Sequence, residues 1–235
     1  MAASLSSETI EPVDIPNLIQ SILIYALPVL FAITVHEAAH GYVARHFGDN
    51  TAYVMGRVTL NPFKHIDPIG TILMPLMLYF ATSGAFLFGY AKPVPVNFGH
   101  LRNPKRDMIW VALAGPGSNF IQAILWALVF VGLIAAGVSE PFFIKMAQGG
   151  VLVNLVMCAF NLFPLPPLDG GRVLAGLLPR GQAQMFLARI EPYGFFIVMA
   201  LVLAGVVSKY WLSPLMAVGY QAIELLISPL TALLR

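Results

Sequence analysis

Residues 18–40 read LIQSILIYALPVLFAITVHEAAH, an apolar run that ends in His36-Glu37-Ala38-Ala39-His40. The run carries no charged side chain before Glu37, and a helix of this length is long enough to cross a bilayer. Residues four positions apart lie on one face of a helix, so the imidazoles of His36 and His40 can hold one metal ion. The stretch therefore predicts a membrane-spanning helix that carries a metal site.

The composition is that of an integral membrane protein. Of the 235 residues, 58% are hydrophobic and 10% are charged, and the mean hydropathy is +0.80. A soluble domain carries about 25% charged residues. The formal net charge is only +2 and there is no long basic run, which argues against nucleic acid as a partner. Cys158 is the only cysteine, which excludes an intramolecular disulfide and argues against zinc coordination by cysteine.

Five apolar segments have the length of full membrane spans. A sixth, 69–88, has cationic loops on both sides, and both loops cannot face the cytoplasm if the segment crosses once. Possible breaks at Gly70, Pro75 and Gly84 favour a re-entrant segment, and a true sixth span is the alternative. The five predicted spans cover residues 18–43, 108–136, 142–163, 193–207 and 211–234.

The distribution of charge orients the first span. Residues 1–16 carry acidic side chains and no Lys or Arg, whereas Arg45 and Arg57 follow the span. The positive-inside rule then puts the N-terminus outside and these cations in the cytoplasm. The helix from Leu18 to His36 covers roughly 27 Å at 1.5 Å per residue, and the hydrocarbon core is roughly 30 Å thick. We therefore expect His36 inside the membrane, close to the cytoplasmic face.

A catalytic zinc ion needs a third protein ligand and an open position for water. Asp169 is the best candidate, because it follows the third predicted span and returns to the depth of His36 and His40. Three prolines just before it prevent a regular helix, and free backbone at that depth needs a protein or aqueous lining. The alternative is an N-cap or turn aspartate. We expect one zinc ion per chain. Glu37 lies between the two histidines and can accept a proton from a water molecule bound to that ion.

Three motifs in this order resemble those of the site-2 protease family, zinc metalloproteases that cut transmembrane segments. They are HEAAH at 36–40, AGPGSN at 114–119 and NLFPLPPLDG at 161–170. The stretches 56–70 and 88–97 are similar to those of its short subgroup, which has no PDZ domain.

The resemblance implies a role for each matched residue. It implies that the zinc ligands are His36, His40 and Asp169, and that the catalytic base is Glu37. It implies substrate-binding or site-supporting roles for Asn161, Pro164 and Asn119. It also implies a small membrane-associated β-hairpin around 89–96, near the cytoplasmic face, that could pair with an unwound substrate strand.

Other interpretations compete at several positions. Asn161 could simply bond its own helix end, and Asn119 is balanced between helix packing and the site. For Gly115 we favour close helix packing by a small residue. His65 lies in a predicted loop, where a histidine is usually solvated or bonded locally.

The sequence thus predicts an all-α, polytopic membrane helix bundle, a single transmembrane metalloprotease domain over 1–235, with a core at 18–172 and C-terminal helices at 193–234. The expected activity is that of an intramembrane zinc endopeptidase acting on transmembrane proteins or peptides. Such activity would release a membrane-tethered factor or clear remnant signal peptides. The expected location is a prokaryotic inner membrane.

Two alternatives to this activity are a zinc-binding transporter and an inactive scaffold. A transporter should carry polar groups along a path through several spans, whereas here they cluster at one depth. The intact HExxH motif and Asp169 argue against an inactive scaffold.

Overall fold

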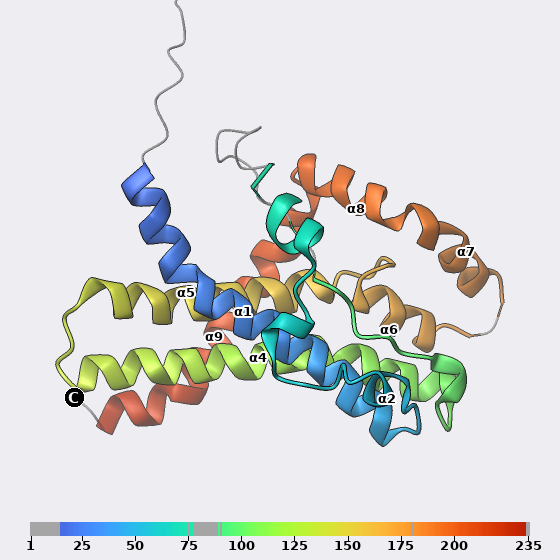
Figure 1. The fold of residues 1–235 in the computed structure, drawn as a ribbon, viewed down its shortest axis with the longest axis horizontal. Helices are drawn as coiled ribbons and strands as arrows, with labels where there is room; N and C mark the ends of the chain where they lie inside the picture. The colour runs from blue at the N-terminus through green and yellow to red at the C-terminus, as the bar shows by residue number, and fades with distance from the viewer. Residues whose placement is uncertain (1–14, 75, 78–88, 90, 180, 234–235) are drawn as a thin grey trace, which may run out of the picture.

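A computed structural model describes residues 15–74, 76–77, 89, 91–179 and 181–233. Every regular element among these residues is helical (Figure 1). The helices are α1 (Ile15–His46), α2 (Thr51–Val54), α4 (Pro104–Ala135), α5 (Pro141–Asn161), α6 (Asp169–Leu177), α7 (Gln182–Ile190), α8 (Gly194–Leu203) and α9 (Ser213–Leu233). Short 3-10 or π turns lie at η1 (Pro62–Lys64), η2 (Pro68–Leu73), η3 (Phe98–His100), η4 (Glu191–Tyr193) and η5 (Ser208–Leu212).

Five helical stretches in the described part of the chain are long and apolar enough to cross a membrane, which confirms the five predicted spans. The fourth begins earlier than predicted, because α7, η4 and α8 continue one another. Pro192 lies in the first turn of η4, where a missing N–H is tolerated. The five stretches are Leu18–His46, Pro104–Ala135, Pro141–Asn161, Gln184–Leu203 and Ser208–Ala232.

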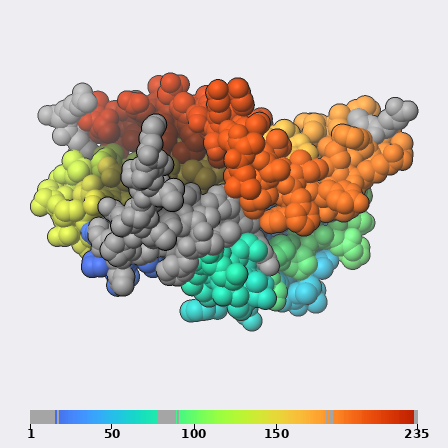
Figure 2. Space-filling view, turned by 90° about the horizontal axis from the view of Figure 1, so that it is seen from above, coloured from blue at the N-terminus to red at the C-terminus, as the bar shows by residue number. Residues whose placement is uncertain are grey.

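The predicted re-entrant segment at 69–88 falls largely outside the described residues. Its described beginning is the π-helical turn η2, which is capped by the Asp67 carboxylate through the backbone amides of Ile69 and Gly70. Figures 1 and 2 both show η2, in teal, beside the orange helix α8.

Helix α4 lies at the centre of the fold and packs against α1, α5 and α6. Small residues allow this close packing: a Cβ at Gly150 of α5 would lie 2.2 Å from the Trp126 ring of α4. One buried cluster joins α4, α5 and α9 and consists of Ala123, Ala127, Val151, Leu155 and Ile223. Large apolar side chains such as Ile22, Phe31 and Leu125 are exposed on the outside, as expected for helices that face lipid.

The predicted β-hairpin around 89–96 is wrong, since the described residues contain no strand. Pro93 and Pro95 have no backbone N–H, so one edge of the segment cannot pair with a second strand. The amides that remain bond elsewhere: the Lys92 N–H donates to the His65 carbonyl, and the Val94 N–H donates to the Glu37 side chain. The segment is therefore irregular chain held against α1.

Candidate metal centre

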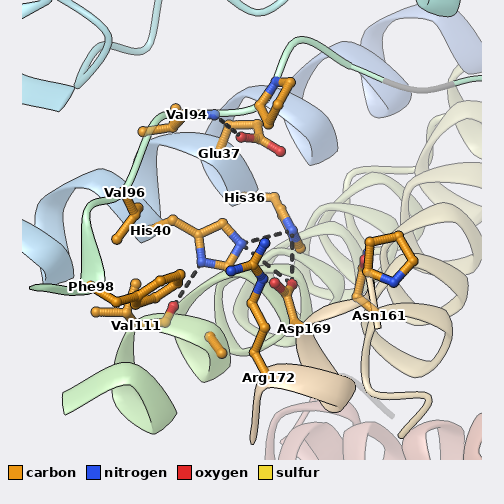
Figure 3. A pocket seen from close by; sticks show the side chains of 13 residues that line it. His36, Glu37, His40, Val94, Val96, Phe98, Val111, Asn161, Asp169 and Arg172 are labelled. Carbon is orange, nitrogen blue, oxygen red and sulfur yellow. Dashed lines mark hydrogen bonds and ion pairs between the residues drawn. The ribbon is translucent and has the colours of Figure 1, made fainter. Parts of the chain in front are cut away.

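Two histidines of α1 and the first residue of α6 meet in one cluster, which Figure 3 shows from close by. The Nε2 atoms of His36 and His40 are 3.1 Å apart. The Oδ2 atom of Asp169 lies 3.3 Å from each of them. The three predicted zinc ligands are thus placed close enough to hold one metal ion.

The hydrogen bond made by the Nδ1 atom of each ring determines which nitrogen faces the centre of the cluster. His36 Nδ1 donates to Asn119 Oδ1 at 2.6 Å, and His40 Nδ1 donates to the Val111 carbonyl at 2.7 Å. A carbonyl oxygen can only accept, so each ring carries its proton on Nδ1. When the imidazoles are neutral, both Nε2 atoms therefore present a lone pair toward the cluster centre.

The cluster has the chemistry of a cation site. Two imidazole lone pairs and a carboxylate oxygen face one another, and Asp169 Oδ2 is buried without a hydrogen-bond donor among the described residues. Buried acceptors in this arrangement need a cation between them. In tetrahedral zinc with bonds of about 2.0–2.1 Å, neighbouring ligand atoms are about 3.3 Å apart. The observed separations fit that geometry, with a fourth position left for water or substrate.

Gly115 of α4 provides the space that the imidazoles occupy. A Cβ at this position would lie 2.5 Å from both His36 Cε1 and His40 Nε2. The sequence favoured helix packing for Gly115, but its close neighbours are the rings of the two predicted metal ligands. The arrangement of the two rings on α1 therefore requires a residue without a side chain at position 115 of α4.

Two glycines after Asp169 place its carboxylate. A Cβ at Gly170 would lie 2.1 Å from the Leu162 carbonyl oxygen, and a Cβ at Gly171 would lie 2.2 Å from the backbone nitrogen of Pro166. The first turn of α6 can thus lie directly on the backbone of the proline-rich loop that follows α5. This close packing presents Asp169 at the depth of the two histidines.

The cluster lies at the wall of a cavity of about 210 Å³. Glu37 lines this cavity, and its carboxylate accepts a hydrogen bond from the Val94 N–H at 2.7 Å (Figure 3). Asn161 also lines the cavity, although its amide donates to the Met157 carbonyl of its own helix. Pro164 is exposed and does not line the cavity, while Arg172 does.

A chain of buried amides supports His36 from behind. The Asn119 amide nitrogen donates to the Ala32 carbonyl at 3.1 Å and to Asn154 Oδ1 at 3.0 Å. Asn154 in turn donates to the Gly150 carbonyl at 2.9 Å. Asn154 was not identified from the sequence. A polar side chain within an apolar span is costly, and this cost could have indicated a role for it.

Asn119→Ala is expected to weaken zinc binding by about 10- to 100-fold, as the loss of an outer-shell partner of a ligating histidine typically does. The substitution frees His36 to rotate and leaves its Nδ1 unpaired. Competition with a fluorescent zinc chelator on detergent-solubilised protein measures the change. Gln122→Ala is the matched control, because Gln122 lies on the same helix but lines a separate apolar groove with Phe31 and Trp126. Equal zinc affinity in the two variants would contradict the supporting role.

The comparisons with known proteins agree with this chemistry. The family model of Peptidase family M50 matches residues 134–205. The chain is 39% identical over 212 residues to "Putative zinc metalloprotease YwhC" of Bacillus subtilis, which covers 86% of this chain and 90% of that protein. It is 30% identical over 227 residues to "Putative zinc metalloprotease Rip2" of Mycobacterium tuberculosis, covering 93% and 83% respectively. No solved structure gives a significant match.

Proposed function

The chain belongs to peptidase family M50, the site-2 protease family, and from this membership we propose that it is an intramembrane zinc endopeptidase. The multi-pass helical fold makes it an integral membrane protein. The proposed substrates are transmembrane proteins or peptides, cut in or near their membrane-spanning segments.

One observation carries the proposal: three acceptor atoms, separated by 3.1–3.3 Å, converge beside Glu37 at the wall of one cavity. His36, His40 and Asp169 would hold the zinc ion. Glu37 projects from the turn of α1 that carries both histidines and lines the cavity that water and substrate would enter.

Zinc bound at this site would act as a Lewis acid toward a peptide carbonyl and would acidify water. Glu37 would accept a proton from water and deliver it to the departing amine. The Asn119 and Val111 oxygens keep both imidazoles in the tautomer that presents Nε2. A helical substrate must unwind first, since its carbonyls are tied up in backbone hydrogen bonds, and Gly or Pro in the target segment would help.

The proposed orientation follows from charge. His36 lies ten residues before the end of α1, and Arg45 and His46 form the basic last turn. The positive-inside rule puts that end in the cytoplasm, so the site would lie within the membrane near the cytoplasmic side, and water would reach it from there. The inner membrane of a prokaryotic cell is the proposed location. Asn161 would help to bind the substrate, and Asn119 would support the metal site.

Removal of zinc is expected to abolish cleavage of a test substrate whose transmembrane helix contains a Gly-Pro break. Protein in liposomes is stripped with a membrane-permeable chelator, checked for metal content, and then reloaded. Because the metal supplies the Lewis acid, the rate should fall by at least about 100-fold and return with zinc.

His40→Ala serves as the control that reloading cannot rescue. Mass spectrometry of the products locates the cut, which we expect within the apolar segment. Undiminished cleavage by protein shown to be free of metal would contradict the proposal, and so would a cut confined to soluble tails.

A further inference from the structure

Arg57 is buried although it lies in a connecting segment rather than in a span. The residue is 8% exposed, and among the described residues no carboxylate pairs with its side chain. A buried, unpaired guanidinium is costly, and an arginine cannot lose its charge to avoid that cost. Its position must therefore be held by other partners.

Those partners are two successive backbone carbonyls of the segment 91–97, part of which lines the cavity. Arg57 Nη2 donates to the Lys92 carbonyl at 2.9 Å and to the Pro93 carbonyl at 3.3 Å. The same segment is bonded from its other side, because the Lys92 N–H donates to the His65 carbonyl at 2.9 Å. His65 is itself buried, with a ring nitrogen bonded to the Thr59 carbonyl.

The next available amide of this segment is the one that reaches Glu37. The Val94 N–H donates to Glu37 Oε2 at 2.7 Å (Figure 3). It follows immediately after the carbonyls that Arg57 holds. Pro93 and Pro95 flank it and have no N–H, so neither can take over this bond.

The absence of a side chain at Gly41 allows the segment to approach α1. Gly41 lies one helical turn after Glu37, on the same face. A Cβ there would lie 2.8 Å from the Val58 side chain and 3.2 Å from that of Val94. The chain around Arg57 and the chain around Val94 thus both press on the face of α1 that carries Glu37.

We propose that Arg57 is a positioning residue for the reaction: it fixes the peptide groups at 92–93, and thereby holds the Val94 N–H where it orients the Glu37 carboxylate. Arg57 touches neither the metal ligands nor the cavity centre. This inference rests on the proposed function, in which Glu37 handles the proton. It assigns a role to the stretch 56–70, which the metal site itself does not use.

Arg57→Met tests the proposal, because methionine keeps much of the length and apolar stem but donates no hydrogen bond. We expect kcat to fall by about 10- to 100-fold, in the range that a displacement of about 1 Å near the reacting groups can produce. KM and zinc content should stay within about twofold of the unmodified protein. Arg57→Lys keeps a cationic donor and should recover a large part of kcat.

A second measurement is independent of activity. Hydrogen exchange of the peptide that contains residues 91–97 should rise in Arg57→Met and stay low in Arg57→Lys. Exchange within α1 should not change. Arg45→Met is the matched control, since Arg45 lies over the Tyr53 ring and does not contact the segment.

Loss of zinc in Arg57→Met, an unchanged kcat, or unchanged exchange at 91–97 would each overturn the positioning role. If the unmodified protein cleaves no membrane substrate while it binds zinc, the proposed function fails. In that case, hydrogen exchange at residues 92–94 is the one measurement that still tests whether Arg57 holds the segment.

Discussion

Glu37→Gln is expected to bind zinc as tightly as the unmodified protein and to lose about 100- to 10,000-fold of the cleavage rate, the usual contribution of a positioned acid–base group. Glutamine has nearly the same size, and its carbonyl oxygen can still accept the Val94 N–H, so the local structure should persist. The amide cannot accept a proton from water. The test is kcat for a transmembrane substrate, measured together with zinc content.

Glu224→Gln provides the matched control, since this carboxylate is exposed on α9 and does not line the cavity. We expect its activity to be unchanged. If Glu37→Gln cleaved at the normal rate, proton transfer would have to be assigned to another group. If it lost zinc as well as activity, Glu37 would be a structural residue of the site and not a base.

Gly115→Ala is expected to remove zinc from the protein. The new Cβ would lie 2.5–2.6 Å from three atoms of the His36 and His40 rings, well inside van der Waals contact. Both rings are held by hydrogen bonds on their far nitrogens, so moving them breaks a second set of contacts. We expect zinc affinity to fall by more than the roughly 10- to 100-fold typical of a lost outer-shell partner, with cleavage falling in parallel.

Gly117→Ala is the control, two residues further along the same helix. A Cβ at Gly117 meets no atom within 4 Å, and alanine is a better helix former than glycine. Zinc content by mass spectrometry and circular dichroism of both variants separate loss of the site from loss of the fold. Full zinc occupancy in Gly115→Ala would mean that the rings have room to move, and that the site does not require a glycine at position 115.

The sequence predicted those features that depend on local spacing. His36 and His40 lie one turn apart on any helix, so the prediction of a helix was enough to predict that their side chains converge. The placement of Asp169 followed from chain topology, since the two further crossings by the second and third spans return the chain to the side where the first span ends. The five spans followed from apolar length alone.

The features that the sequence did not predict depend on contacts between distant segments. Nothing in the local pattern around Gly115 reveals that imidazoles lie against it, and nothing near Arg57 reveals that a buried guanidinium holds residues 92–93. The hairpin prediction failed because Pro93 and Pro95 block one edge of the segment, and the amides of Lys92 and Val94 bond to His65 and Glu37 instead of to a second strand.

The imidazoles of His36 and His40 differ in how easily mutation can disturb their orientation. His40 is oriented by the main-chain carbonyl of Val111, which every amino acid supplies, whereas His36 is oriented by the side chain of Asn119. Any apolar residue that fits at 111 leaves His40 in place, but few changes at 119 spare His36. Of the two positions that orient these rings, 111 should therefore tolerate substitution and 119 should not.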